Sequence, residues 1–213
     1  MSNCPDIRLA QETDVPQLKT HWLRCFPEDT PADVDAFFQT VWPLADCLIA
    51  LSPEAPERPA SMAFLLPAEV CFSGQRLPVR YLYAGCTAPE FRGRGLYTAL
   101  LDAAKTYTAA HGAYALYLHP ATPELEPLYR RAGYRPEIRR ANDKAYRFTA
   151  NTSAPFWQPV APIAAFFALT AGNSTGNSTV PAKPVAMWLP TAPSPALQRA
   201  MKETGGYTAL LGE

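Results

Sequence analysis

The chain has 213 residues, of which 48% are hydrophobic and 11% aromatic, so it can bury a sizeable core in one domain, with or without an appendage. Its 19 basic and 19 acidic residues balance to a net charge of zero. General binders of nucleic acids or membrane surfaces need an excess of basic residues, so the composition excludes both as partners. Any anion-binding site must therefore be local.

The cysteines number five and include no Cys-x-x-Cys pair: Cys4, Cys25, Cys47, Cys71 and Cys86. This odd number and spacing indicate neither a zinc site nor a disulfide framework, so we expect no metal and reduced, mostly buried thiols. The first ten residues lack the apolar core of a secretory signal, and the apolar stretch APIAAFFALTAG is too short to cross a bilayer. The sequence predicts a cytoplasmic protein.

In chain order, apolar periodicity predicts short elements in the first third of the sequence. They are a strand at 7–10, helices at 14–24 and 33–42, a strand at 46–51, and a surface loop rich in Pro and Glu at 53–59. Two β-rich runs follow, at 60–72 and 77–88, and the tripeptide SGQ between them indicates a hairpin.

A helix is then predicted at 96–110, stopped by Gly112, followed by a strand at 113–119, a short helix ending at Gly133, and a strand at 144–149. Residues 150–184 are rich in Pro, Ala, Ser, Thr and Asn and predict a long loop. A strand at 185–189, a helix at 195–203 and a strand at 207–211 complete the pattern. This order is typical of an α+β fold with a mixed sheet.

The stretch EFRGRGLY, residues 90–97, lies at a predicted strand-to-helix junction. A glycine-spaced loop that leads into a helix exposes consecutive backbone N–H groups at the positive end of the helix dipole, where phosphate oxygens bind well. Arg92 and Arg94 add charge. Alone, the motif is equally typical of a positively charged turn, because it lacks the Lys-Ser/Thr ending of a nucleotide P-loop.

The runs YAGCTAPEFRGRGLYTALL (83–101) and LYLHPATPELEPLYRRAGYRP (116–136) resemble the Gcn5-related N-acetyltransferase (GNAT) superfamily. The family's Arg/Gln-x-x-Gly-x-Gly/Ala loop, which binds the pyrophosphate of acetyl-CoA, corresponds to Arg92–Tyr97. The resemblance is most specific over 60–136, moderate over 6–59 and weak beyond 183. It implies an α+β fold whose mixed, mostly antiparallel sheet is flanked by helices. We therefore expect a core at 1–149, with the 150–184 loop and a closing strand-helix-strand at 185–213 in the same domain.

The resemblance also implies site residues. Tyr129 would lie near the thioester sulfur as the catalytic acid. The acetyl-CoA-binding residues would be Cys86, Thr87, Ala88, Arg92, Gly93, Arg94, Gly95, Leu96, Tyr97 and Thr98.

Two departures from the family pattern bear on this site. Tyr97 occupies a position where the family has Gly or Ala, so its ring must either pack on the sheet or narrow the cofactor groove. Thr122–Leu125 stands where the family often has Asn-x-x-Ala; Thr122 can still cap the helix, but Pro127 forces that helix to begin late or to kink.

The general base is not identified by the sequence. Glu69 and His119 are candidates, although each is more typical of a surface or hydrogen-bonded residue. Cys86 could act as a nucleophile, but a cysteine in an apolar strand more often serves packing, and Glu90 is expected to face solvent.

The resemblance predicts transfer of an acetyl group from acetyl-CoA to an amine of a small molecule or peptide, by direct attack in a ternary complex. The alternative is a non-catalytic acyl-CoA-binding sensor or scaffold. The acceptor and the oligomeric state, including a homodimer, are left open by the sequence.

Overall fold

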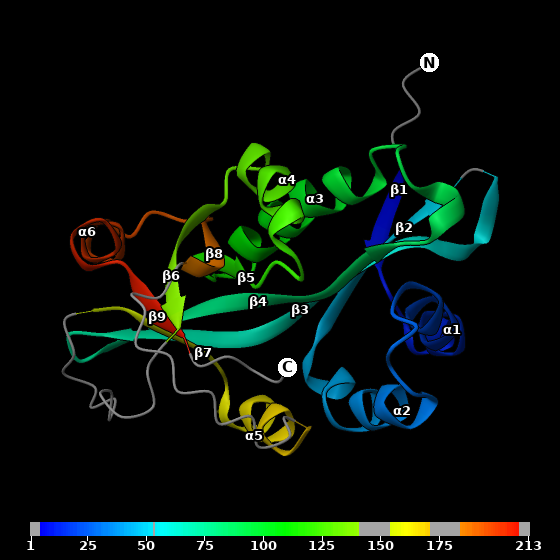
Figure 1. Ribbon diagram of the computed structural model, residues 1–213, viewed down its shortest axis with the longest axis horizontal. Helices are drawn as coiled ribbons and strands as arrows, with labels where there is room; N and C mark the ends of the chain where they lie inside the picture. Colours follow the sequence, from blue (N-terminus) through cyan, green and yellow to red (C-terminus); the bar gives the residue numbers. More distant parts are fainter. Residues whose placement is uncertain (1–4, 53, 141–153, 171–183, 209–213) are drawn as a thin grey trace. The chain divides into compact units, whose positions relative to one another are not determined.

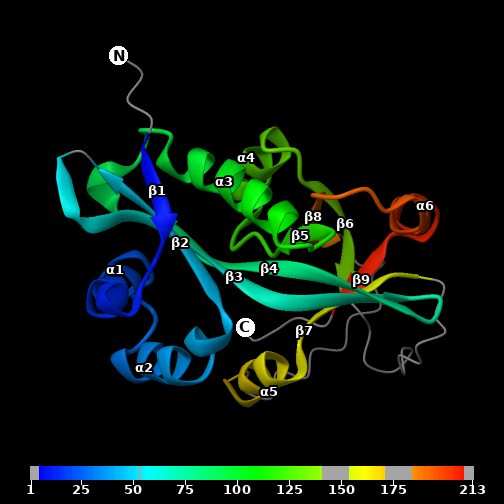
Figure 2. The same ribbon diagram turned by 180° about the vertical axis from the view of Figure 1, so that it is seen from behind.

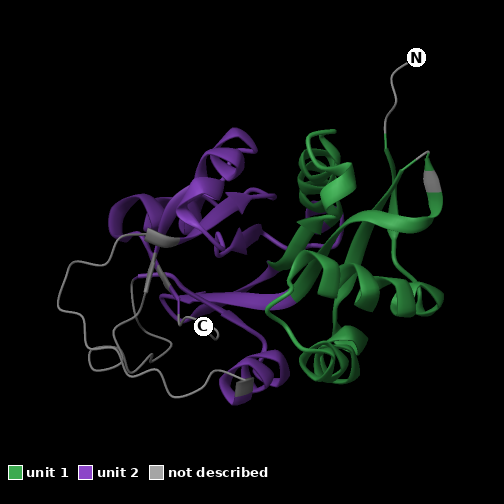
Figure 3. Ribbon diagram, turned by 45° about the vertical axis from the view of Figure 1, so that its right-hand side comes forward, with its two compact units in different colours: residues 1–66, 82–107 green, residues 67–81, 108–213 purple. Residues whose placement is uncertain are grey.

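The computed structural model describes residues 5–52, 54–140, 154–170 and 184–208, and Figure 1 labels their helices and strands. The chain divides into two compact units (Figure 3). Unit 1 comprises residues 1–66 and 82–107, and unit 2 comprises residues 67–81 and 108–213. Two long strands, β3 (Ala55–Phe72) and β4 (Gln75–Thr87), contribute residues to both units.

Unit 1 is built on an antiparallel sheet. Strand β1 (Asp6–Leu9) pairs with β2 (Asp46–Ser52), and β2 pairs with the first part of β3, with Cys47 opposite Phe64 and Ile49 opposite Met62. Alternate side chains of these strands point to opposite faces, and β2 and β3 are buried along most of their length in this unit. Both faces of the sheet are therefore covered.

The helices of unit 1 provide that cover. Helices α1 (Val15–Cys25) and α2 (Pro31–Thr40) lie on one face of the sheet and α3 (Leu96–Ala110) on the other (Figures 1 and 2). An aromatic cluster joins α1 and α2 to the sheet, with ring centroids 4.7 to 6.2 Å from that of Trp22. Its rings belong to Trp22, Phe26, Phe37, Phe38, Phe64 and Tyr83. Short 3-10 turns, η1 (Glu12–Asp14), η2 (Trp42–Leu44) and η3 (Pro89–Phe91), complete the unit.

Unit 2 contains a closed ring of strands. The hairpin of β3 and β4 turns at Ser73 and Gly74, whose φ angles of 46° and 74° provide the left-handed turn. From β4 the order is β5, β8, β6, β9 and β7, and β7 pairs back with β3. These strands are β5 (Ala115–Leu118), β6 (Arg135–Arg140), β7 (Phe156–Pro159), β8 (Pro184–Pro190) and β9 (Gly206–Thr208). A closed ring of strands has no open sheet edge.

The helices of unit 2 are α4 (Glu126–Arg131), which follows the 3-10 turn η4 (Pro123–Leu125), α5 (Ala161–Thr170) and α6 (Pro195–Thr204). Large aromatic side chains fill the core of this unit. The ring of Tyr117 stacks on Tyr81 at 4.8 Å and contacts Trp157 at 5.4 Å, and Trp157 contacts Trp188 at 5.7 Å.

The predicted fold class is confirmed: the strands pair mostly antiparallel, with parallel pairs only at β4–β5, β6–β9 and β7–β9 among the registers of the described residues. Two predicted loops are wrong in part. Strand β3 already begins at Ala55, within the predicted 53–59 loop, and residues 156–170 of the predicted 150–184 loop form β7 and α5.

Strand β6 was not predicted, because its sequence RPEIRR is mostly polar. The strand expected at 144–149 and the end of the last strand lie outside the described residues. Among the helices that are described, none is long and apolar enough to span a membrane.

Candidate functional site

The glycine-spaced corner lies in unit 1, between η3 and the first residue of α3. Gly93 and Gly95 have φ angles of 75° and 76°, and a Cβ added at either would meet nothing within 4 Å. Glycine is therefore required here by the left-handed backbone and not by lack of space. Arg92 to Gly95 are all exposed, and α3 begins with the bond from Ala99 N–H to Gly95 O at 3.0 Å. The first turn of such a helix presents N–H groups with no acceptor inside the helix.

The arginines of this corner are held by the protein itself. Arg94 donates to Glu54 Oε2 at 2.7 Å and to Glu90 O at 3.3 Å, while Arg92 Nε donates to Thr87 O at 3.1 Å. The guanidinium of Arg94 also lies 5.4 Å from the ring centroid of buried Phe91. Both arginine side chains are exposed, so they fix the loop and keep positive charge at its surface.

The end of β4 lies directly before this corner. Ala84 has a φ of 45°, a left-handed conformation for a residue with a side chain, which interrupts the regular strand geometry. Ser61 Oγ donates to Cys86 O at 2.7 Å and lies 2.9 Å from Thr87 Oγ1. Ala88 N–H donates to Ala60 O at 3.0 Å, so this amide already has an acceptor within the protein.

The ring of Tyr97 packs against β4. A Cβ added at Gly85 would lie only 2.2 Å from Tyr97 Oη and 2.9 Å from two ring carbons, so the ring occupies the space that a side chain at Gly85 would need. Of the two orientations open from the sequence, the structure shows packing on the sheet. The bulky residue in the loop thus faces a glycine in the strand.

A cluster of two thiols and an imidazole lies beside the end of β4, and we call it the thiol–imidazole cluster. His21 and Cys25 are one turn apart on α1, and Cys86 comes from β4. The ligand atoms of the three residues all lie within 4.8 Å of one another, and Cys25 Sγ is 3.7 Å from His21 Nε2. A hydrogen bond from Cys86, another from His21 and the positive charge of Arg92 lower the pKa of Cys25 below its usual range, although burial opposes the shift.

The pKa of Cys86 is raised well above its usual range by burial and by its hydrogen bond with Cys25. This direction favours a protonated Cys86 beside the Cys25 sulfur. The expectation of mostly buried thiols was wrong: of the described cysteines, Cys47 is buried, while Cys25, Cys71 and Cys86 are half-buried.

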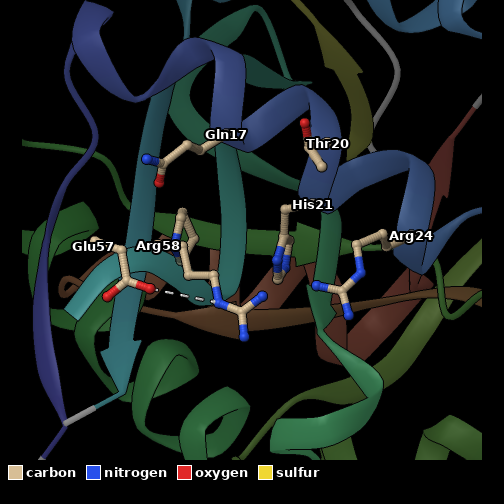
Figure 4. A pocket seen from close by; sticks show the side chains of 7 residues that line it. Gln17, Thr20, His21, Arg24, Glu57 and Arg58 are labelled. Atoms are coloured by element: carbon tan, nitrogen blue, oxygen red, sulfur yellow. Dashed lines mark ion pairs between the residues drawn. The ribbon is translucent and has the colours of Figure 1, made fainter. Parts of the chain in front are cut away.

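A pocket of about 270 Å³ opens next to this cluster, also within unit 1 (Figure 4). Its lining side chains come from α1 and the start of β3, and they are Gln17, Thr20, His21, Arg24, Glu57, Arg58 and Pro59. His21 belongs both to the pocket wall and to the thiol–imidazole cluster. The pocket thus lies beside α1, and His21 is the residue that it shares with the cluster.

Glu90 forms an ion-pair network at the rim of this region. Its carboxylate accepts two hydrogen bonds from Arg24 Nη2, at 2.8 and 2.9 Å, and lies 3.6 Å from Arg58 Nη2. These contacts lower the pKa of Glu90, with the backbone hydrogen bond of the residue itself as the largest contribution. Glu90 is exposed, as expected, but it also binds two arginines that are remote in sequence, which the sequence did not predict.

Tyr129 lies in unit 2, on α4, and is buried with 6% of its surface exposed. Its ring contacts Tyr134 edge-on at 5.8 Å, and its carbonyl accepts from Tyr134 N–H at 3.0 Å. Pro127 falls in the first turn of α4, which begins only at Glu126, so the prediction of a late start is confirmed. The side chain of Thr122 makes no capping hydrogen bond, which contradicts the predicted cap.

The two candidate bases from the sequence are both engaged in unit 2. Glu69 Oε1 accepts from Arg76 Nη1 and from Gln158 Nε2, each at 2.7 Å. His119 Nδ1 lies 3.2 Å from Tyr81 Oη, and burial lowers the pKa of His119 to about 4. These contacts favour structural roles for both residues.

Neither the thiol–imidazole cluster nor the pocket was predicted from the sequence. The i, i+4 spacing in HWLRC does place His21 and Cys25 on one helix face, which is a local signal. Cys86, Glu57 and Arg58 join them only through the tertiary fold.

Comparison with known proteins identifies the family. A sequence profile described as the acetyltransferase (GNAT) domain matches residues 6–136. No curated protein matches the sequence. Among solved structures, the GNAT family N-acetyltransferase YhbS from Escherichia coli in complex with CoA has a TM-score of 0.57 at 14% identity, over 97% of this chain and 89% of that chain.

Two further structures share the fold. A GNAT acetyltransferase from Staphylococcus aureus Mu50 has a TM-score of 0.53 at 9% identity, over 88% of this chain and 99% of that one. A probable N-acyltransferase from Enterococcus faecalis V583 has a TM-score of 0.56 at 20% identity, over 62% of this chain; this chain spans only 32% of that protein. At these identities the structures show a common fold, and the profile covers more than half of the sequence. The chain belongs to the acetyltransferase (GNAT) family, whose domain uses acetyl-CoA.

Proposed function

We propose that this protein transfers an acetyl group from acetyl-CoA to an amine of a small molecule or peptide, by direct attack in a ternary complex. The observation that carries the proposal is the exposed corner at Gly93 and Gly95, where two left-handed glycines lead into the N-terminus of α3. Successive N–H groups and the helix dipole suit a pyrophosphate at this position. The open space around both glycines supports the same assignment.

Acetyl-CoA supplies an activated thioester when it is bound. The protein has to hold the acetyl carbonyl, stabilise negative charge on its oxygen and protonate the departing sulfur. Because Ala88 N–H already donates to Ala60 O, we infer that the oxyanion donor is the N–H of Cys86 or Thr87. We assign protonation of the sulfur to the Tyr129 hydroxyl, on the strength of its position in the family's motif.

We infer that the acceptor amine enters through the pocket on α1. The pocket reaches His21, whose ring nitrogen lies 3.7 Å from Cys25 Sγ, and the Cys25 sulfur lies within 4.8 Å of the Cys86 sulfur at the end of β4. Imidazole is the side chain most often used to accept a proton in catalysis. His21 is therefore our candidate for the base that deprotonates the amine.

The pyrophosphate assignment is tested by charge reversal at the corner. The double variant Arg92→Glu/Arg94→Glu should weaken acetyl-CoA binding on the order of 10-fold or more in calorimetric titration, because it removes two positive charges and adds two negative ones. Lys105→Glu makes the same kind of change further along α3, at an exposed position, and should leave the affinity nearly unchanged. Equal affinity of the double variant and the wild type would show that the corner does not bind the cofactor.

Turnover separates the enzyme from a sensor. Release of free CoA should be measured against a panel of amines, amino acids and peptides. Tyr129→Phe should bind acetyl-CoA normally and lose most of its turnover, and His21→Gln should lose turnover with an altered pH profile. Intact binding without turnover on any acceptor would favour a non-catalytic acyl-CoA-binding module.

A further inference from the structure

The thiol–imidazole cluster has a second chemical capacity that acetyl transfer does not use. Cys25 and Cys86 bring their sulfur atoms within 4.8 Å of each other. Both residues lie in unit 1, Cys25 at the last position of α1 and Cys86 near the end of β4. Two half-buried thiols thus meet beside a pocket that one member of the cluster, His21, lines.

The surroundings of the two sulfurs are unequal. The Cys86 thiol, the His21 imidazole and the Arg92 guanidinium all favour negative charge on Cys25, whereas burial keeps Cys86 protonated. The three groups come from separate parts of unit 1: β4, α1 and the glycine corner. Thiolates are the nucleophilic form of cysteine, so Cys25 is the attacking sulfur of the pair and Cys86 is a protonated neighbour.

The other described cysteines lack this arrangement. Cys47 is 2% exposed, and burial strongly raises its pKa. The pKa of Cys71 is raised by burial and by the charge of Glu69. Among the residues that the structure describes, a cysteine with a lowered pKa next to a second thiol therefore occurs only at Cys25.

We propose that Cys25 and Cys86 form an oxidation site that reacts with hydroperoxides and closes to a disulfide. In the first step the Cys25 sulfur attacks one peroxide oxygen; an S–O bond forms, the O–O bond breaks, and the departing oxygen takes a proton to leave as water or an alcohol. Cys25 is then a sulfenic acid. In the second step the Cys86 sulfur attacks the Cys25 sulfur, the S–O bond breaks, and hydroxide leaves as water with the proton of Cys86. The two thiols lose two electrons and two protons in total, and the peroxide is reduced.

A metal site is the other chemistry that one imidazole and two thiols suggest, since this ligand set suits zinc. The positive charge of Arg92, which acts on both sulfurs, opposes a divalent cation there and favours a thiolate. The oxidation site therefore agrees with the whole environment of the cluster, and metal binding becomes an outcome of the test.

The experiment uses the full chain with Cys4→Ser and Cys71→Ser, which leaves Cys25, Cys86 and the buried Cys47. The protein is treated with limiting hydrogen peroxide and followed by intact mass and peptide mapping under non-reducing conditions. We expect loss of two hydrogens and a Cys25–Cys86 crosslinked peptide, reversed by a dithiol reductant. Cys25→Ser should slow the oxidation on the order of 100-fold, because it removes the thiolate.

Cys86→Ser provides the second variant. It should stop at the sulfenic acid on Cys25, trapped by a dimedone adduct at that residue, while circular dichroism confirms that each variant is folded. Three results would overturn the proposal: no crosslink between Cys25 and Cys86, unchanged oxidation rate in Cys25→Ser, or stoichiometric binding of Zn²⁺ that protects both thiols from peroxide. None of these readouts depends on acetyl transfer.

Discussion

His21 in unit 1 and His119 in unit 2 have different surroundings. In unit 1, His21 contacts Cys25 and lines a pocket of about 270 Å³. In unit 2, His119 contacts Tyr81, while its Nε2 atom is buried without a hydrogen-bond partner among the described residues. Position in the sequence made His119 the candidate base; the surroundings of its ring make it a structural residue.

The same contrast extends to the neighbours of each histidine. Two other buried polar atoms of the unit 2 core, Tyr117 Oη and Trp157 Nε1, also lack a hydrogen-bond partner among the described residues. An unsatisfied buried group costs free energy, which tight aromatic packing must offset. In unit 1 the sulfur and nitrogen atoms of the cluster instead contact one another. We therefore expect substitutions in the unit 2 core to change stability, and those in the cluster to change chemistry.

The largest effect is expected for Trp157→Ala. Trp157 is fully buried and contacts both Tyr117 and Trp188, so its removal leaves a large cavity in the ring of strands. The free energy of unfolding in urea should fall by about 3–5 kcal/mol. Leu169→Ala is the control: Leu169 also belongs to unit 2 but is 87% exposed. Its substitution should change the free energy of unfolding by less than about 0.5 kcal/mol. Equal losses for the two variants would show that the core is not packed around the indole.

A pH effect of similar size is expected from His119. Burial lowers its pKa in the folded state to about 4, below the unfolded value of about 6.5. Between these values the unfolded chain binds a proton that the folded chain does not, so stability is lost as the pH falls from about 6.5 toward 4. The loss amounts to about 3 kcal/mol at most.

The measurement compares urea unfolding at several pH values for the wild type and His119→Gln. The variant should lose this part of the pH dependence, whereas His111→Gln, at an exposed position, should keep it. If the stability of His119→Gln depends on pH as strongly as that of the wild type, the effect belongs to other groups.

Gly206→Ala tests the same core with a smaller change. An added Cβ would lie 2.6 Å from Trp157 Nε1 and 3.0 Å from Met201 Sδ, so packed side chains must shift. Overpacking of this kind costs about 1–3 kcal/mol. Gly112→Ala is the matched control: its φ is 72° but nothing lies within 4 Å, so it reports backbone strain alone, about 1 kcal/mol. Each glycine variant is then combined with Trp157→Phe, which removes the indole nitrogen. This second substitution should recover part of the lost stability in Gly206→Ala but not in Gly112→Ala.

Local patterns in the sequence predicted much of this fold. The helix expected at 96–110 has the observed bounds, and the SGQ hairpin turns at Ser73 and Gly74 as glycine chemistry requires. Strands β6 and β7 depend on long-range pairing instead: β6 is polar and is held by β8 and β9, and the short β7 pairs with β3 and β9. No window of sequence contains that information.

The candidate site divides in the same way. The glycine corner was predictable because its motif is contiguous, and Tyr97 could be recognised as a departure. The thiol–imidazole cluster was not, since His21 and Cys86 meet only when α1 packs beside β4. The ion pairs of the exposed Glu90 were not predictable either, because Arg24 and Arg58 reach it from distant segments. Sequence alone predicts backbone-defined features better than side-chain clusters.

The smallest effect is expected at Gly85, in unit 1, and it sharpens the contrast with Gly206. An alanine Cβ at Gly85 would meet Tyr97 Oη at 2.2 Å, a more severe overlap than at Gly206. Tyr97, however, is half-buried and contacts Gly85 with the far end of its side chain, so the ring can swing away. Gly85→Ala should therefore cost less than about 1 kcal/mol, below the range for a clash in a packed core.

In a double-mutant cycle with Tyr97→Ala, the cost should disappear, since the overlapping atoms are gone. If Gly85→Ala costs as much in the Tyr97→Ala background as in the wild type, the ring does not fill the space above Gly85, and the pairing of a bulky loop residue with a strand glycine is wrong.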